Sequence, residues 1–307
     1  MRKLLLLLPF FLFSGCSQNH YNIPVQNLSD QIRVLGVAPI MIDAGSDIDH
    51  PEKNQLVSTL AEINRDTEHL FVRKLKSTGN FYTVALLDGE PEKVFSSMLF
   101  RREKRDDASI KYNKYFWKND ELREYIRKNN LDAVMLIVVS GIRKTDRISS
   151  LTLLSSLTAE YNYLIMTAQI LDANGSILWE YPNFRRRILT YSPLINLQYP
   201  DFSEAEANRF PKANVKFKSI EGIRRSLQEK GKDLLMRETN EPEAYVEQFN
   251  SMISLLKYNP DASKPKQEPG PVTEKPRPRP TEPVMPALSQ PAAQNPEAVP
   301  PAVPAQQ

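Results

Sequence analysis

Apolar positions divide the central part of the chain into alternating strands and helices. Arg33–Ile42 and Leu131–Ile142 are almost continuously apolar and rich in branched side chains, a pattern typical of strands buried on both faces. Phe81–Leu87 predicts a further strand. Between residues 54 and 76 the apolar positions recur at steps of three, four and seven, which predicts one long amphipathic helix that ends before Gly79. The apolar face of this helix comprises Leu56, Leu60, Ile63, Leu70, Phe71 and Leu75.

The remaining periodicity predicts a hairpin and more helices. Residues 148–181 are predicted to form two long strands that join at Asp172–Ser176, because Asn174-Gly175 is a strong hairpin signal that switches the sheet to antiparallel pairing. Residues 192–213 are expected to be irregular. Helices are predicted at residues 90–100, 120–130, 217–238 and 242–257. The expected fold class is α/β (α+β), a mixed sheet flanked by helices.

The first sixteen residues, MRKLLLLLPFFLFSGC, have the features of a secretion signal that ends at a cysteine. The apolar run Leu4–Phe13 is shorter than the roughly 20 residues that span a membrane, but it suits a signal peptide. Leu12–Cys16 resembles a bacterial lipobox, which implies removal of residues 1–15 and lipidation of Cys16. Ser17 resembles the outer-membrane sorting pattern. The alternatives are an ordinary secretory signal with an incidental cysteine, or a buried core cysteine.

Composition separates a tether, a folded body and a tail. Residues 16–30 are polar and are expected to carry the lipid and link it to an α/β domain at residues 31–258 that faces the periplasm. Fourteen of the 24 prolines lie beyond Asn259, so residues 259–307 are expected to be disordered. This tail is interpreted as an extended spacer, and Pro276–Pro280 (PRPRP) is alternatively a ligand for an aromatic groove.

Charge and motif content argue against several functions. Without both ends the body has 33 basic and 32 acidic residues, whereas a nucleic-acid binder usually has a basic surplus. The single cysteine and three histidines have no ligand spacing for a zinc site. The ten glycines form neither a phosphate-binding loop nor a nucleophile elbow. We therefore expect no enzymatic activity, cofactor, metal or nucleic-acid partner.

Two loops contain candidate binding residues. Tyr112, Tyr115, Phe116 and Trp117 cluster in a predicted loop and are either core residues or an exposed protein interface. The loop of Asp43, Asp47 and Asp49 could hold a hard cation, although turn chemistry is the simpler interpretation.

Histidine and arginine positions leave further alternatives. His69 could be a general base but is expected on a helix surface, and His50 is expected in a loop or at a helix entry. The basic runs at residues 101–105 and 185–187 either contact anionic lipid or form solvated faces.

The order of these features resembles one family of envelope proteins. The lipobox, the strand VLGVAPI, the long helix, FYTV, LDAVMLIVVSGI and QILDANGSILWEY follow one another as in the α/β domain shared by CsgG, LpoB and the N-terminal domain of TolB. In these relatives a strand that ends at Ala-Asp and an apolar residue precedes a hairpin with Asp, Gly and Trp. Asp132, Asp172, Gly175 and Trp179 occupy comparable places over a match of residues 33–188.

The resemblance implies a non-catalytic outer-membrane lipoprotein that acts as a binding or assembly module, for example as a secretion or transport accessory. The alternative is a regulator of peptidoglycan synthesis of LpoB type. Expected partners are the membrane, through lipidated Cys16, an envelope protein or peptidoglycan, and further copies of the chain in a homo-oligomer. CsgG-like pore formation would use residues 148–168 as a membrane hairpin, and a buried sheet strand is the other interpretation.

Overall fold

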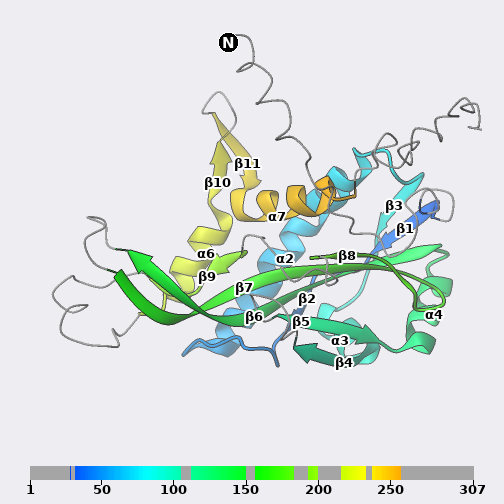
Figure 1. Ribbon diagram of the computed structural model, residues 1–307. Coiled ribbons are helices and arrows are strands. Elements are labelled where there is room, and N and C mark those ends of the chain that lie inside the picture. Colours follow the sequence, from blue (N-terminus) through cyan, green and yellow to red (C-terminus); the bar gives the residue numbers. More distant parts are fainter. Residues whose placement is uncertain are drawn as a thin grey trace, which may run out of the picture. The chain divides into compact units, whose positions relative to one another are not determined.

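A mixed β-sheet with helices on both faces forms the framework of the protein (Figure 1). The computed structural model describes residue 28 and residues 32–104, 112–149, 156–182, 193–199, 216–232 and 237–256. Within these residues seven strands form the main sheet, in the order β3-β1-β6-β7-β8, with β2 paired to β6 and β9 paired to β7. The expected α/β class with a mixed sheet and flanking helices is confirmed.

The parallel half of the sheet contains a break within a continuous run of apolar residues. The predicted strand at residues 33–42 is two strands, β1 (Val34–Val37) and β2 (Met41–Asp43). Both pair in parallel with β6 (Ala133–Ser149), and β1 also pairs with β3 (Thr83–Leu86). The break follows from Pro39, which has no N–H for a sheet ladder. The prediction of one continuous strand was therefore wrong.

The antiparallel half begins where β6 pairs with β7 (Ser156–Asp172), which in turn pairs with β8 (Ile177–Tyr181) and β9 (Ile195–Asn196). The predicted turn is confirmed. Gly175 adopts φ 79°, and the carboxylate of Asp172 accepts hydrogen bonds from the backbone N–H groups of Asn174 and Ser176.

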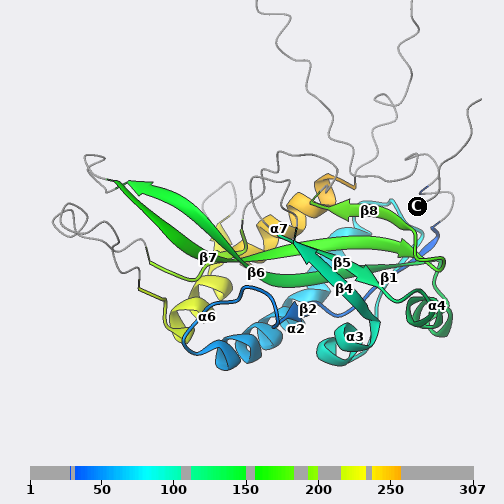
Figure 2. The ribbon, with the colours of Figure 1, turned by 60° about the horizontal axis from the view of Figure 1, so that its bottom comes forward.

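Beyond β9, the β6–β7 pair continues as a two-stranded ribbon that reaches Ser149 and Ser156 (Figure 2). Thr158 and Glu160 of this ribbon are exposed, whereas Leu164, Ile165 and Met166 are buried in the sheet. Of the two alternatives for residues 148–168, the buried strand therefore describes the part next to β9. Residues 150–155, between the two strands, lie outside the described residues.

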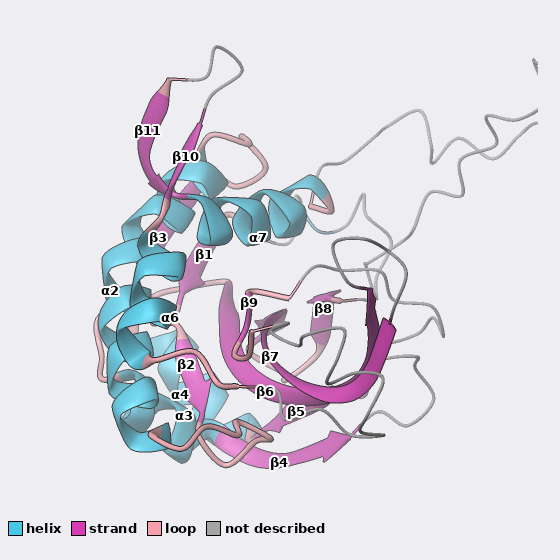
Figure 3. Ribbon diagram, turned by 90° about the vertical axis from the view of Figure 1, so that its left-hand side faces the viewer, coloured by secondary structure: helices cyan, strands magenta, loops and turns pink. Residues whose placement is uncertain are grey.

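Three helices cover one face of the sheet and enclose the larger core (Figure 3). They are α2 (Lys53–Lys76), α6 (Ile220–Gln228) and α7 (Glu243–Ser254). The apolar face predicted for residues 54–76 is confirmed, because all six of its side chains are buried. The opposite side of α2 carries exposed polar residues, among them His69.

The segment after α6 differs from the prediction of one helix over residues 217–238. The helix ends at Gln228, and β10 (Lys230–Lys232) and β11 (Glu238–Pro242) form a small antiparallel hairpin before α7. Gly231 lies three residues after this end, in β10, and the low helix propensity of glycine disfavours continuation of the helix. The hydroxyl of Thr239 donates to the Gly231 carbonyl at 3.0 Å, a contact between residues that helical spacing would separate.

The second face of the sheet is covered by α3 (Pro91–Met98), α4 (Asn119–Lys128) and a two-stranded sheet of β4 (Leu99–Lys104) and β5 (Asn113–Trp117). The prediction of a loop for residues 112–117 was wrong. In β5 every second side chain is buried, which is the period of a strand. The large apolar Phe116 occupies an outward position and hides this alternation in the sequence.

Candidate functional site

Of the two sites predicted from sequence, one lies within the described residues. Cys16 is outside them, as are Arg185–Arg187 and the Pro-rich tail. The aromatic cluster lies on and just before β5, so the β4–β5 hairpin is the part of the candidate site that the geometry can address. In Figure 2 this hairpin lies at the front of the molecule, beside α3.

The aromatic cluster is mainly a core element. Tyr112, Tyr115 and Trp117 are 1%, 2% and 8% exposed, so core packing, rather than an exposed interface, describes these three. Phe116 is only partly buried and points to the other side of the hairpin. Phe95 of α3 packs edge-on against Tyr115 and Trp117, with ring centroids 5.9 and 6.1 Å away.

A buried carboxylate connects the hairpin to the main sheet. Asp43, the last residue of β2, accepts hydrogen bonds from the Arg102 guanidinium at 2.7 and 2.9 Å and from the Tyr115 hydroxyl at 2.9 Å. Its Oδ1 also accepts from the backbone N–H of Gly45 at 3.1 Å. The Asp43 side chain is 3% exposed and that of Arg102 is 39% exposed. One charge is thus buried with a partner that reaches solvent.

Three further polar contacts hold β5 against the antiparallel strands. The Trp117 indole N–H donates to Oε1 of Gln169 at 2.7 Å, and the Gln169 amide donates to the Tyr115 carbonyl at 3.4 Å. Lys114 Nζ lies 3.6 Å from Oε2 of Glu180, a side chain that is only 1% exposed. Because Gln169 and Glu180 are direct neighbours on β7 and β8, these contacts form one polar seam below the hairpin.

The surroundings of the Tyr115 hydroxyl keep this group protonated. Burial raises the pKa of Tyr115 well above its ordinary value, and the negative charge of Asp43 raises it further. The Tyr115 hydroxyl therefore remains a hydrogen-bond donor to Asp43 across the physiological pH range. Such a group positions strands and is poorly suited to act as a base.

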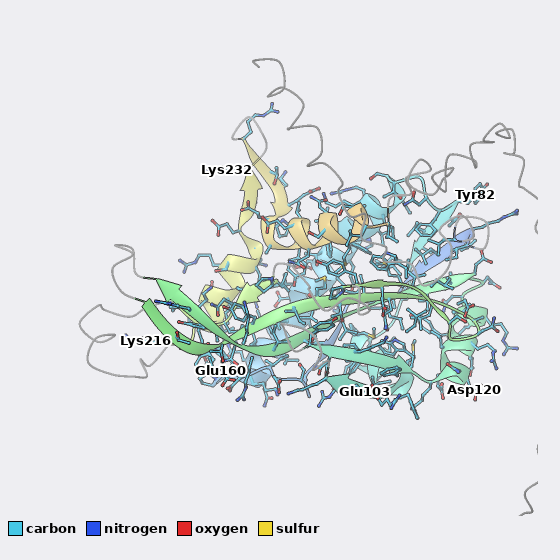
Figure 4. The ribbon with its side chains drawn as sticks, viewed as in Figure 1. Tyr82, Glu103, Asp120, Glu160, Lys216 and Lys232 are labelled. Carbon is cyan, nitrogen blue, oxygen red and sulfur yellow. The ribbon has the colours of Figure 1, made fainter. Side chains whose placement is uncertain are left out.

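The outward side of the hairpin has a different chemistry. The Arg101 guanidinium lies 4.4 Å from the centre of the Phe116 ring, and Arg101 also pairs with Glu103 on the same strand. Phe100 is 66% exposed. Glu103 lies on the side of the hairpin away from the main sheet, far from Tyr82, a strongly exposed aromatic residue beside β3 (Figure 4). An arginine and an aromatic ring together are typical of protein interfaces.

The aspartate loop that precedes α2 is explained by ion pairs. Besides the Asp43–Arg102 pair, Asp47 lies 2.6 Å from Lys104 and Asp49 lies 3.2 Å from Arg143. Each of these three carboxylates thus has a cationic side chain as its partner. In the described part of the chain, no group of three or more His, Cys, Asp or Glu residues is arranged to hold a metal ion.

His50 is buried, and hydrogen bonds at both ring nitrogens fix its orientation. Its Nδ1 accepts from the Glu52 N–H at 3.0 Å, so Nε2 carries the proton and donates to the Lys218 carbonyl at 2.8 Å. The ring thereby joins the start of α2 to the residues before α6, as expected for a helix-entry position.

Sequence reasoning missed Asp43, Arg102, Gln169 and Glu180 as one connected set. The two halves of each contact are 50 or more residues apart, and no local motif marks them. The available signals were an aspartate directly after an apolar run and an arginine in the basic run at residues 101–105. Taken alone, the aspartate indicates turn chemistry, and the basic run indicates a solvated or lipid-binding face.

Comparison with known proteins does not identify the chain. No protein-family model matches it, and no curated protein does. Among solved structures, the neuraminyllactose-binding hemagglutinin homolog from Helicobacter pylori is similar over 53% of this chain and 69% of its own, with 10% identity and a TM-score of 0.23. Within the described residues, no helix is both long and apolar enough to cross a membrane.

Proposed function

We propose that the protein is a non-catalytic lipoprotein of the bacterial outer membrane, a binding or assembly module anchored through Cys16 and facing the periplasm. The observation that carries this proposal is the position of the only cysteine, directly after a short apolar run and Ser14-Gly15. Several acyl chains on one residue hold a protein firmly at a membrane, since each buried CH₂ contributes about 0.8 kcal/mol.

The described side chains are consistent with a binding role. Asp43 is engaged with Arg102 and Tyr115, Glu180 with Lys114, and Glu68 with a backbone N–H. These buried carboxylates are thus engaged in contacts that hold strands and helices together, whereas a catalytic acid or base needs access to a substrate proton. Anchoring such a module to a surface raises its effective concentration toward partners without any new contact.

We also propose that the domain belongs with the α/β domains of CsgG, LpoB and TolB. The order of the elements supports this assignment: β1, the long helix α2 and β3 precede β6, and the Asp172–Ser176 turn follows. Asp132 lies directly before β6, and its carboxylate accepts hydrogen bonds from the backbone N–H groups of Arg33 and Val34, both at 2.8 Å. This position thus has a structural role in aligning β1 with β6.

The anchor is tested by labelling cells with a palmitate analogue and separating their membranes. The unchanged chain should be labelled and float with the outer membrane, and Cys16→Ala should lose the label and leave that fraction. Ser17→Ala is the matched control, since it changes the neighbouring residue and keeps the cysteine. An unlabelled mature protein, or one released into the medium, would refute the proposal.

The sorting residue and the partner need separate measurements. Ser17→Asp should move the labelled protein to the inner membrane, and unchanged sorting would contradict the outer-membrane assignment. Capture of partners from solubilised membranes, with the full chain and with a chain that ends at Asn259, tests whether the tail contributes. Co-purification with a penicillin-binding protein would favour a regulator of peptidoglycan synthesis over a transport accessory.

A further inference from the structure

Strand β4 has one edge that no described strand covers. It pairs with β5 on one side, and among the described residues no strand pairs with its other side. All residues from Phe100 to Lys104 are exposed, and Phe100 exposes 66% of its surface. An open edge presents unpaired N–H and C=O groups, so it is a template for another strand. The arrangement in Figure 3 places β4 as the outermost strand on its side of the molecule.

The charges on the β4 edge of one copy are complementary to those on the β4 edge of a second copy. In an antiparallel pair of two β4 strands centred on Arg102, Arg101 of each copy lies opposite Glu103 of the other. Two other registers pair five or more residues, and they place Arg101 opposite Arg101 or opposite Arg102. Like charges in directly opposite positions are destabilising. The register centred on Arg102 places Arg102 opposite Arg102 of the second copy, but it alone of the three registers pairs Arg101 with Glu103, and it does so twice. It is therefore the favoured one.

The neighbouring strand extends this pattern. Within one copy Arg101 lies opposite Phe116, and Glu103 lies opposite Lys114. Across the paired edges, one face of the resulting four-stranded sheet would carry Phe116, Arg101, then Glu103 and Lys114 of the second copy, in one row. The row contains two neighbouring pairs of opposite charge, Arg101 with Glu103 and Glu103 with Lys114. It also contains the contact between Arg101 and the Phe116 ring, which already exists within one copy at 4.4 Å.

We infer that the β4 edge is a homodimer surface, through which two copies of the chain join their β4–β5 hairpins into one antiparallel sheet. Arg102 is fixed inward on Asp43 at 2.7 and 2.9 Å, so its charge is neutralised at the centre of the interface and the strand is already ordered before association. The residues of this edge are distant in sequence from Cys16, so we expect the dimer whether or not Cys16 carries a lipid.

Charges on an edge strand also serve to prevent association. Here they discriminate between partners: they oppose the other two registers and any basic strand, and they favour a second copy in one register. A six-residue edge is a small interface, so we expect a weak dimer whose population rises at a crowded surface.

The test uses charge reversals in the full chain, extracted in mild detergent and measured by sedimentation over a range of concentrations. Arg101→Glu should weaken the dimer about tenfold or more, and so should Glu103→Lys, because each places two like-charged pairs across the edge. An equimolar mixture of the two variants should recover association, since every contact between unlike copies is again between opposite charges.

The mixture separates the contact between copies from the Arg101–Glu103 pair within one strand, which mixing cannot restore. Asp120→Lys is the matched control, because Asp120 lies on α4 and its side chain is 96% exposed. It should leave the dimer unchanged, and circular dichroism should give the same melting curve for all variants. A chain that stays monomeric at every concentration, or a dimer that tolerates both single reversals, would overturn the inference.

Discussion

Replacement of Asp43 by Asn should loosen the attachment of the β4–β5 hairpin. The carboxylate accepts four hydrogen bonds: two from Arg102, one from the Tyr115 hydroxyl and one from the Gly45 N–H. An amide has one acceptor oxygen, and its NH₂ group would face donors of Arg102 or Tyr115. The substitution therefore keeps the volume of the side chain and removes both the charge and part of the accepting capacity.

The expected loss in the free energy of unfolding is about 2–3 kcal/mol. A fully buried pair would cost about 3–5 kcal/mol when one partner is removed. The Arg102 side chain is 39% exposed and can be rehydrated, which places the value at the lower end. Asp47→Asn is the matched control, since Asp47 belongs to the same loop and pairs with Lys104 of the same strand at 2.6 Å. Its side chain is 34% exposed and that of Lys104 is 54% exposed, so this loss should stay below about 1 kcal/mol.

Urea unfolding of the full chain, followed by far-ultraviolet circular dichroism, measures both variants. Combining Asp43→Asn with Arg102→Met should be less destabilising than the sum of the two single changes, because the single Asp43 variant leaves an unpaired cation that the double variant lacks. If Asp43→Asn and Asp47→Asn were equally stable within about 0.5 kcal/mol, the reasoning on the buried carboxylate would be refuted.

Three further predictions concern the cores. Gly141→Ala should lower the free energy of unfolding by about 3 kcal/mol, because its new methyl group overlaps the backbone of Asp47 and Ile48, whereas Gly36→Ala meets the flexible end of Leu131 and should lower it by only about 1 kcal/mol; equal losses in urea unfolding would contradict this. Tyr245→Phe removes the 2.6 Å hydrogen bond to buried Asn64 and should lower the free energy of unfolding by about 1–2 kcal/mol, and a neutral result would show that Asn64 finds another partner. Burial raises the pKa of Glu68 above its ordinary value despite the hydrogen bond from the Ile40 N–H. The contribution of this side chain to stability is therefore present at low pH and is lost as the pH rises through the folded-state pKa. Relative to the unchanged protein, Glu68→Gln should gain stability as the pH rises above about 4, the ordinary pKa of a glutamate, and a difference that does not change with pH would argue against this.

Much of the main sheet and its larger core could be predicted from short stretches of sequence. The face of α2 is encoded in the spacing of its apolar residues, and β6 in a run that is buried on both sides. The Asp172–Ser176 turn needs only local chemistry, since Asp172 binds the N–H groups of residues two and four positions later. These elements are set by neighbours in sequence, so no knowledge of distant contacts was required.

The candidate site depended on contacts that the chain forms only after folding. Tyr115 and Trp117 form a strand because β4 provides the opposite edge and because Asp43 and Gln169, 72 and 52 residues away in sequence, satisfy their polar atoms. In isolation the same aromatic residues were equally compatible with a core and with an exposed surface. Likewise, α6 ends at Gln228 although the predicted periodicity continued, and Gly231 pairs in a hairpin in which Thr239 of β11 donates a hydrogen bond to its carbonyl.

The sequence by itself determined the alternation of apolar strands and helices and the tight turn after β7, and it is the basis of the proposal that Cys16 carries a lipid. Each of these features depends on the order of a few consecutive residues, which is already present in an extended chain. The tertiary structure alone decided which aspartate is buried with which arginine, which side of β5 faces the core, and which strand edge stays open. Those outcomes depend on long-range packing, because a charge or a ring is stabilised only by the groups that surround it after the chain has folded.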